Sequence, residues 1–375
     1  MRKLLIGMII LLLLVPSVVS VSINKTSQSK NGRTLYVGGN GPGNYTSIQD
    51  AIDDAVNGDT VFVYNDSSPY HEELIVDKSI KLIGEDKKST VIEIFESSAI
   101  IQVTGSGVII SDFTIRSRRG WLKENFGIEL YGYVGGNTIE NNCIENVEFG
   151  ILISVTYYNN IRNNEITNGR YGILLSGSSY NNIYQNNITN NNNGIWADLG
   201  GMCHSCDNNN IYLNNIINNN EGISITCTRY SSQPRNNNIS QNNIMYNRRG
   251  IYIDSKSYDN NIYHNNFINN IRNAKDKNCN GNYWDDGTEG NYWDNYRGKD
   301  KDGNGIGDRP YWIPPYIIGN KDRYPLMEPY DDVPDVSIKS VNKLINNRAS
   351  SYSLYYWFLE RFPLLREVLL RIINH

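Results

Sequence analysis

The sequence is poor in the residues that several protein classes require. Charged residues make up only 20% of the 375 residues, and the formal net charge is −4. A nucleic-acid-binding protein normally shows an excess of basic residues, so we expect no nucleic-acid partner. Eleven prolines are too few for a Pro-rich or collagen-like chain. Only four histidines and five cysteines are present, so few positions could carry their chemistry.

Long hydrophobic runs are also rare, and the first one lies at the N-terminus. Arg2 and Lys3 precede the apolar run Leu4–Val15, and Pro16 and the small residue Ser20 follow it. This order is typical of a signal peptide over residues 1–20, and the run is shorter than the roughly 20 residues that span a membrane. We therefore expect a secreted, extracellular or cell-surface protein.

Asparagine, in contrast, is abundant. The chain holds 56 asparagines, and 39 of them lie between residues 151 and 300. Asparagine is a poor former of both helices and strands. Such a segment is therefore either disordered or a repeat whose turns require asparagine. Isoleucine recurs throughout the segment, which favours the repeat.

The repeat has a period of 22 to 29 residues and three short apolar pieces per period. The pieces form three series, of which the last two advance by identical spacings: Gly-Ile pairs starting at Gly127, Gly150, Gly172, Gly194, Gly222 and Gly250; Ile139, Ile161, Ile183, Ile211, Ile239 and Ile262; and Ile144, Ile166, Ile188, Ile216, Ile244 and Phe267. An asparagine stands two residues before every member of the last two series. Pieces this short are strands, so the pattern predicts an all-β solenoid, a three-sheet parallel β-helix of roughly ten rungs of about 22 residues. Ile161, Ile183 and Ile211 should stack in one sheet.

The start of the solenoid is predicted to carry a cap. Residues 45–58 include apolar residues at helical spacing, with Ser47 as N-cap and Gly58 beyond the end. A short helix there would cover the open end of the strands.

Several motifs resemble one known family. They are Tyr45–Ile52 (YTSIQDAI), Gly58–Val61 (GDTV), Asp77–Glu85 (DKSIKLIGE), the Asn-Asn-x-Ile and Gly-Ile rungs, and an exit motif in 280–328 with Gly281–Trp284 (GNYW), Gly290–Tyr296 (GNYWDNY) and Tyr324–Leu326 (YPL). Together they resemble the NosD/CASH group of pectin-lyase-like proteins. The resemblance implies a right-handed parallel β-helix over residues 34–330. It also implies a secreted prokaryotic protein with carbohydrate- or copper-related roles, often without known catalysis. NosD itself is tied to assembling the copper centre of nitrous-oxide reductase.

One outward-facing cluster could bind or cleave a polysaccharide. Alternation along the Gly-Ile strands places Trp196, Asp198, Tyr252 and Asp254 on the outer face, with Thr226 on the rung between the two carboxylates. Two rungs separate Asp198 from Asp254 by about 9.6 Å, close to the carboxyl separation of inverting glycosidases. We favour solvated carboxylates over a catalytic pair. The same four residues form the candidate carbohydrate-binding surface.

Two lengthened repeats carry cysteines just after the Gly-Ile strand. The first holds Met202, Cys203, His204 and Cys206, and the second holds Cys227. Because neighbouring rungs place these loops together, a disulfide could join Cys227 to Cys203 or Cys206, which we prefer outside the cell. Alternatively, Cys203, His204, Cys206 and Cys227 could bind copper or zinc through soft ligands.

An acidic loop in the exit motif resembles part of a calcium loop. Oxygen-bearing side chains stand at loop positions 1, 3, 5 and 9 (Asp300, Asp302, Asn304 and Asp308), and Ile306 stands at position 7, where a backbone carbonyl normally binds. The pattern predicts a calcium site, although position 12 is Tyr311 and not glutamate.

The C-terminal part of the chain differs from the repeat. Residues 331–351 read as a linker, and residues 352–375 as an amphipathic helix. Five charges within 353–373 argue against a spanning helix, so this segment should contact a membrane surface or a partner protein. Our leading expectation is a non-catalytic scaffold that binds carbohydrate or another cell-surface polymer. The alternatives are a polysaccharide hydrolase or lyase at Asp198 and Asp254, and a NosD-like periplasmic copper-handling protein.

Overall fold

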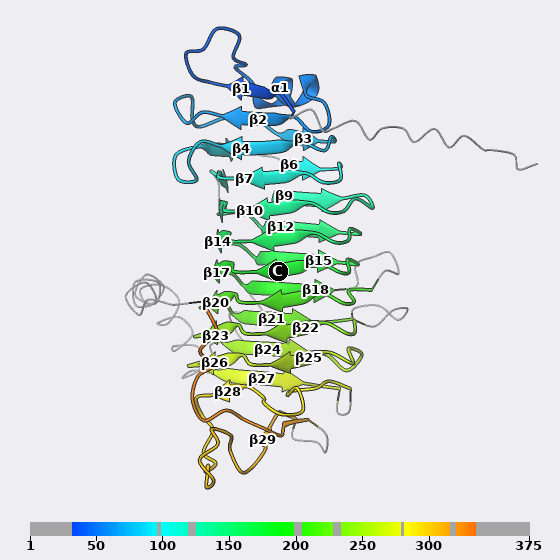
Figure 1. Ribbon diagram of the computed structural model, residues 1–375, viewed down its shortest axis with the longest axis vertical. Helices are drawn as coiled ribbons and strands as arrows, with labels where there is room; N and C mark the ends of the chain where they lie inside the picture. Colours follow the sequence, from blue (N-terminus) through cyan, green and yellow to red (C-terminus); the bar gives the residue numbers. More distant parts are fainter. Residues whose placement is uncertain are drawn as a thin grey trace, which may run out of the picture.

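A computed structural model describes residues 32–95, 99–118, 125–198, 205–227, 234–278, 281–315 and 320–334. Figure 1 shows strands stacked along one long axis, from blue β1 at one end to the orange segments at the other. The predicted signal peptide, the predicted tail helix and all of the predicted linker after residue 334 lie outside the described residues. Within these ranges, no helix has the length and apolar character needed to cross a membrane.

Three all-parallel sheets form the body of the molecule, and each complete rung, from β4–β6 to β25–β27, contributes one strand to each sheet. Sheet A consists of β1 (Thr34–Val37), β2 (Thr60–Val63), β4 (Lys81–Gly84), β7 (Ile109–Ser111), β10 (Thr138–Glu140), β13 (Asn160–Arg162), β16 (Asn182–Tyr184), β19 (Asn210–Tyr212), β22 (Asn238–Ser240) and β25 (Asn261–Tyr263). Sheet B consists of β5 (Val91–Ile94), β8 (Thr114–Ser117), β11 (Cys143–Glu145), β14 (Glu165–Thr167), β17 (Asn187–Thr189), β20 (Asn215–Ile217), β23 (Asn243–Met245), β26 (Asn266–Ile268) and β28 (Tyr292–Trp293). Sheet C consists of β3 (Leu74–Val76), β6 (Ala99–Val103), β9 (Phe126–Tyr131), β12 (Phe149–Ser154), β15 (Tyr171–Ser176), β18 (Asn193–Asp198), β21 (Glu221–Ile225), β24 (Arg249–Ile253) and β27 (Arg272–Asp276).

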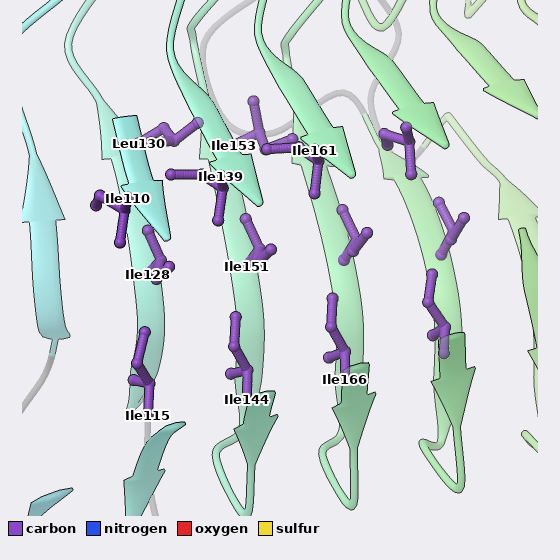
Figure 2. Close-up of a cluster of buried hydrophobic side chains, with 14 of the residues drawn as sticks. Ile110, Ile115, Ile128, Leu130, Ile139, Ile144, Ile151, Ile153, Ile161 and Ile166 are labelled. Atoms are coloured by element: carbon purple, nitrogen blue, oxygen red, sulfur yellow. The ribbon is translucent and has the colours of Figure 1, made fainter. Parts of the chain in front are cut away.

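The register confirms the predicted right-handed parallel β-helix. Ile161 pairs with Ile183, and Ile183 pairs with Ile211, all within sheet A. The core is a column of apolar side chains, mostly isoleucine, stacked between the sheets, and Figure 2 shows several of its layers. Every member of the three apolar series is essentially inaccessible to water.

The asparagines that precede the apolar series form hydrogen-bonded ladders inside the corners. In one ladder, Asn159 donates both its backbone N–H (3.0 Å) and its side-chain N–H (2.9 Å) to Oδ1 of Asn181 on the next rung. In another, Asn164 bonds to Asn186 in the same way, at 3.0 Å for both donors. A third ladder, from Asn191 through Asn219 to Asn247, was not predicted. Buried backbone groups at the corners thereby find partners.

The residue just before each ladder asparagine makes the turn itself. At the corner between sheets A and B, Asn141 and Asn163 take the left-handed backbone conformation, with φ of 53° and 56°. Asparagine tolerates this conformation better than most residues. An Asn-Asn pair therefore divides two tasks: the first residue turns the chain and the second bonds to the next rung.

Both ends of the β-helix are covered. Helix α1 (Ile48–Asp54) packs on β1, β2 and β3, and Ser47 is its N-cap. At the other end, the exit motif folds back with a short antiparallel pair, β29 (Tyr311–Trp312) and β30 (Lys321–Asp322). Trp284 and Trp293 from this motif are buried, and Trp293 stacks on Phe267 of the last complete rung at 4.2 Å. The described exit residues thus close the apolar core.

Candidate functional site

The four residues of the candidate carbohydrate surface lie where the repeat predicts them, on the outer face of sheet C. Trp196 and Asp198 belong to β18, Tyr252 belongs to β24, and Asp254 follows β24 directly. Trp196 pairs in register with Ser224, which pairs with Tyr252. The two aromatic residues are therefore two rungs apart.

Hydrogen bonds link Trp196 and Asp198 through Thr226 on the next rung. The indole Nε1 of Trp196 donates to Oγ1 of Thr226 at 2.6 Å. The Thr226 hydroxyl in turn donates to Oδ1 of Asp198 at 3.3 Å. Asp198 therefore helps to hold Thr226 and, through it, the indole ring.

The carboxylate of Asp254 is committed to the turn that follows β24. Oδ1 accepts from the backbone N–H of Lys256 (3.0 Å) and from the hydroxyl of Ser257 (3.1 Å). Oδ2 accepts from the backbone N–H of Cys227 at 2.7 Å. A catalytic carboxylate must face the substrate, whereas this one stabilises two neighbouring turns. The arrangement favours a structural role for Asp254.

An aromatic row on the same face was missed from the sequence. Rings of Phe126, Phe149, Tyr171 and Trp196 stack from rung to rung, with centroids 4.8 to 4.9 Å apart. The signal was present, because the first three each stand immediately before the glycine of a Gly-Ile pair. The row gives the outer face of sheet C a continuous apolar strip across four rungs.

The strip meets a cationic cluster beyond Trp196. The Arg249 guanidinium lies 4.7 Å and the Lys277 ammonium 5.5 Å from the ring centroid of Tyr252. Arg249 also lies 3.4 Å from the carboxylate of Glu221. Burial raises the pKa of Glu221, and the charge of Arg249 opposes this shift. Two cations thus lie over the ring of Tyr252.

The cysteine predictions need one correction. Cys206 is a free, fully buried thiol, so the disulfide between Cys227 and Cys206 is not formed. Its Sγ donates to the backbone carbonyl oxygens of Asp198 (2.9 Å) and Leu175 (3.4 Å). Cys206 is therefore part of the hydrophobic core. Cys203 and His204 lie outside the described residues.

The same thiol fits a metal site poorly. Burial raises the pKa of Cys206 to about 12, so the thiolate that copper or zinc requires is strongly disfavoured there. Across the part of the chain that the structure describes, no three His, Cys, Asp or Glu side chains gather as metal ligands do. The described residues therefore do not fit the predicted copper or zinc site.

The acidic loop is held by its own backbone. Asp300 accepts from the N–H groups of Gly303 and Gly305, both at 2.8 Å, and these bonds lower its pKa. Asp302 accepts from the side chain of Asn304 at 3.0 Å, and Asp308 is exposed. The geometry does not gather Asp300, Asp302 and Asp308 into a ligand set. The predicted calcium site gains no support from it.

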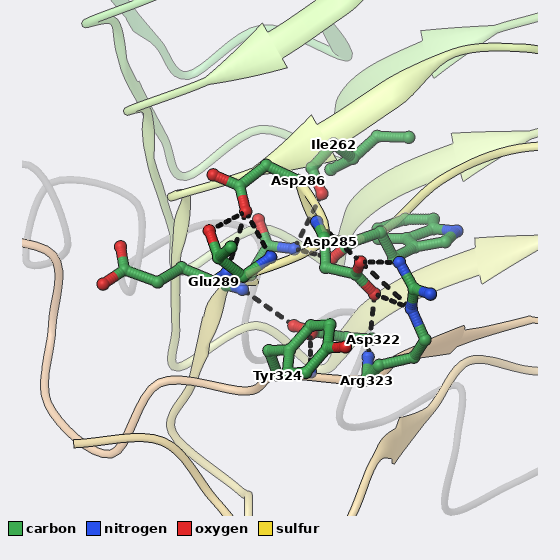
Figure 3. Close-up of polar contacts among 11 residues, drawn as sticks. Ile262, Asp285, Asp286, Glu289, Asp322, Arg323 and Tyr324 are labelled. Atoms are coloured by element: carbon green, nitrogen blue, oxygen red, sulfur yellow. Dashed lines mark hydrogen bonds and ion pairs between the residues drawn. The ribbon is translucent and has the colours of Figure 1, made fainter. Parts of the chain in front are cut away.

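Three buried aspartates lie in the exit motif or, for Asp276, at the end of β27 just before it, and the sequence did not reveal their roles. Asp276 and Asp322 accept from the indole N–H groups of Trp284 (3.2 Å) and Trp293 (2.8 Å). The third, Asp285, forms the bidentate ion pair with Arg323 seen in Figure 3.

Two of these aspartates also end the asparagine ladders. Asn282 donates its side-chain N–H to Asp276 at 3.1 Å, and Asn291 donates its backbone N–H to Asp322 at 2.7 Å. The repeated Asn-Tyr-Trp of the motif therefore supplies the last ladder asparagine and the tryptophan that seals the core.

A family model described as "Periplasmic copper-binding protein (NosD)" matches residues 52–200 and 197–298, more than half of the chain. The chain belongs to the NosD family. This match runs from helix α1 to the start of the acidic loop, so the family resemblance rests on the β-helix itself. No curated protein matches the sequence of this NosD-family chain.

Solved structures with a similar fold are distant in sequence. The mannuronan C-5 epimerase AlgE6 A-module of Azotobacter vinelandii is 19% identical, with a TM-score of 0.45 over 61% of this chain and 73% of that one. Pectate lyase Pel9A is 14% identical, with a TM-score of 0.48 over 69% and 82%. The pectin methylesterase of Aspergillus niger is 14% identical, with a TM-score of 0.44 over 65% and 88%.

Proposed function

We propose that this NosD-family protein binds carbohydrate without cleaving it, through the outer face of sheet C. The observation that carries the proposal is the aromatic row Phe126, Phe149, Tyr171 and Trp196, which continues directly into the hydrogen-bonded pair Thr226 and Asp198. A rigid strip of aromatic edges beside hydroxyl and carboxylate groups suits an extended sugar polymer, because sugars present both apolar C–H groups and hydroxyls.

Binding is favoured over hydrolysis or elimination by the state of the two carboxylates. The Asp254 oxygens accept three hydrogen bonds from the protein, and Asp198 holds Thr226. A polysaccharide-cleaving centre would need these groups for proton transfer. Copper handling, the alternative that the family description favours, has no supporting ligand set among the described residues.

The proposed place of action is outside the cytoplasm. The family description says periplasmic, and residues 1–20 have the pattern of a signal peptide. The segment 353–373 would then contact a membrane surface or a partner protein.

The experiment is a glycan-array screen of the chain from Val21 onward, followed by affinity electrophoresis on each polysaccharide that binds. In the variant Trp196→Leu, affinity should fall about tenfold, as when one aromatic contact is removed. The rungs before Trp196 carry Leu152 and Leu174 at this position, so the fold should tolerate the change. The matched control is Tyr212→Ser on sheet A, which introduces the residue type that Ser240 provides on the next rung. Equal affinity of Trp196→Leu and wild type would reject sheet C as the binding face.

A further inference from the structure

Four exposed tyrosines of the described chain, including its two most exposed aromatic residues, lie at a different place, the corner between sheets C and A. Tyr131, Tyr133, Tyr158 and Tyr180 have exposed fractions of 42%, 67%, 63% and 46%. They stand on three consecutive rungs: Tyr131 ends β9, and the other three lie in the turns after β9, β12 and β15. The rings of Tyr158 and Tyr180 stack with centroids 5.2 Å apart and planes inclined by 21°. We call these four residues the tyrosine corner.

Three of these tyrosines, Tyr133, Tyr158 and Tyr180, have a backbone conformation that does not suit tyrosine, and the last two share one corner position. Tyr158 and Tyr180 have φ of 60° and 61°, in the left-handed region. From Gly136 to the last rung, the other residues at this corner position are Gly136, Asn208, Asn236 and Asp259, the types that tolerate it best. Strained backbone persists where the side chain has a use. For Tyr246, at another corner, that use is packing against Ile217 and Met245, whereas Tyr158 and Tyr180 point into solvent.

One ring face is left open by the preceding rung. The residue equivalent to Tyr158 on that rung is Gly136, which has no side chain to stack on the ring. A methyl group placed on Gly136 would meet no residue beyond its own chain neighbours within 4 Å, so the equivalent position on the preceding rung has room for a bound group. An aromatic face beside an open space can accept the C–H face of a pyranose ring.

The surroundings indicate the charge of the ligand. The three turns 131–137, 154–159 and 176–181 contain no Asp, Glu, Lys or Arg. They offer instead phenol, serine and threonine hydroxyls and backbone groups. The equivalent turns of later rungs carry Asp207, Arg235 and Asp259. An acidic sugar would find no cation at the tyrosine corner itself.

From these observations we infer that the tyrosine corner is a binding subsite for a neutral pyranoside polymer, with a sugar ring stacked on Tyr158 in the space above Gly136. The inference rests on the proposed carbohydrate binding and extends it, because it places the sugar at the corner and specifies an uncharged sugar. Tyr158 and Tyr180 are the binding residues, and Gly136 provides the room.

The test uses the chain from Val21 onward in native gels containing β-glucan, xylan or glucomannan as neutral probes, and alginate or polygalacturonate as acidic ones. In the variant Tyr158→Asn/Tyr180→Asn, both tyrosines are replaced by asparagine, the residue at the equivalent position (Asn208 and Asn236) of the two rungs after Tyr180. We expect about tenfold weaker binding to the neutral probe. The melting temperature should stay equal or rise, because asparagine relieves the backbone strain.

A second variant keeps both tyrosines. Gly136→Asn retains a residue that accepts positive φ and fills the space beside Tyr158, so neutral-probe binding should weaken with the melting temperature unchanged.

If Trp196→Leu loses binding while both corner variants retain it, the corner subsite is overturned and the proposed function stands. Binding of acidic probes alone would overturn the neutral class. No binding to any polysaccharide would overturn the inference together with the proposed function, and would point to a protein partner for the exposed tyrosines.

Discussion

Individual asparagines stabilise this fold, and a buried ladder asparagine should contribute more to the free energy of unfolding than an asparagine on the outer face of a sheet. Asn186 is fully buried, and its Oδ1 accepts the backbone and side-chain N–H groups of Asn164, both at 3.0 Å. Its own side chain donates to the carbonyl of Ile161 at 2.8 Å. Asn182, four residues earlier, makes side-chain bonds only along the outer face of sheet A. Equal residue types thus stand in very different environments.

Replacing the buried asparagine should be far more harmful than replacing the outer one. Asn186→Ala leaves buried N–H and C=O groups without partners, which should lower the free energy of unfolding by about 2–4 kcal/mol. Asn182→Ala should cost about 0.5 kcal/mol or less, as is usual for surface positions. Urea unfolding followed by circular dichroism measures both. Similar losses in the two variants would contradict the ladder interpretation.

Buried aspartates make the exit end sensitive to pH. Burial raises the pKa of Asp276 to about 6 and that of Asp322 to about 7, although both accept several N–H donors. In the unfolded chain these pKa values return to about 3.9. The folded protein therefore binds more protons than the unfolded one between about pH 4 and pH 7. Stability from these groups is greatest at the acidic end of this window and decreases as the pH rises through 6 and 7.

The variant Asp276→Asn isolates one of these groups. The melting temperature of wild type should be higher at pH 5 than at pH 8, and the variant should show a smaller difference. The exposed Asp331→Asn serves as the control and should keep the wild-type difference. If wild type is instead more stable at pH 8 than at pH 5, and Asp276→Asn removes that difference, the predicted direction of the pH dependence is wrong.

At the scale of elements, helix α1 depends on a residue far along the chain. The Ser47 hydroxyl accepts from the backbone N–H of Asp50 at 3.3 Å, as the sequence predicts for an N-cap. Glu72, just before β3, contributes more. Its carboxylate accepts from the backbone N–H groups of Ile48 (2.9 Å) and Gln49 (3.0 Å) and from the Ser47 hydroxyl (2.7 Å). A negative charge at a helix N-terminus is also favourable electrostatically.

Glu72→Gln should therefore loosen the cap. We expect a loss of about 1 kcal/mol in the free energy of unfolding, since one amide oxygen cannot replace a carboxylate at three donors. Glu73→Gln makes the same change of charge at the neighbouring residue and should be nearly neutral. Hydrogen exchange at Ile48 and Gln49 reports the local effect, and equal protection in both variants would contradict this role of Glu72.

The calcium prediction belongs to another element, the acidic loop, and it stays a prediction. If Asp300, Asp302, Asn304 and Asp308 bind calcium, a chelator should lower the melting temperature, because a ligand that binds only the folded state stabilises it. Asp302→Ala should abolish the difference between chelated and calcium-loaded protein. An identical melting temperature with and without chelator would leave the loop as a turn held by Asp300.

At the scale of the whole molecule, the sequence predicted what the period determines. Ile161, Ile183 and Ile211 share one sheet because a fixed spacing can be satisfied only by stacking equal positions. The structural role of the Asp254 carboxylate could not be predicted from the repeat. Its bonds to Cys227, Lys256 and Ser257 depend on the path of turns that interrupt the period. The cap by Glu72 escaped prediction for the same reason, since it joins segments that no repeat relates.

The ladders also make the length of the molecule adjustable during evolution. Outside its own rung, each ladder asparagine bonds only to the rungs on either side, and carboxylates close two of the ladders at the exit end. A gene duplication that copied one rung, such as residues 159–180, would insert a segment whose corner bonds match those of its new neighbours. Each added copy would lengthen the protein by about 4.8 Å. The copy would also bring a second tyrosine like Tyr180, so the same event could lengthen the tyrosine corner that is proposed to bind a polymer.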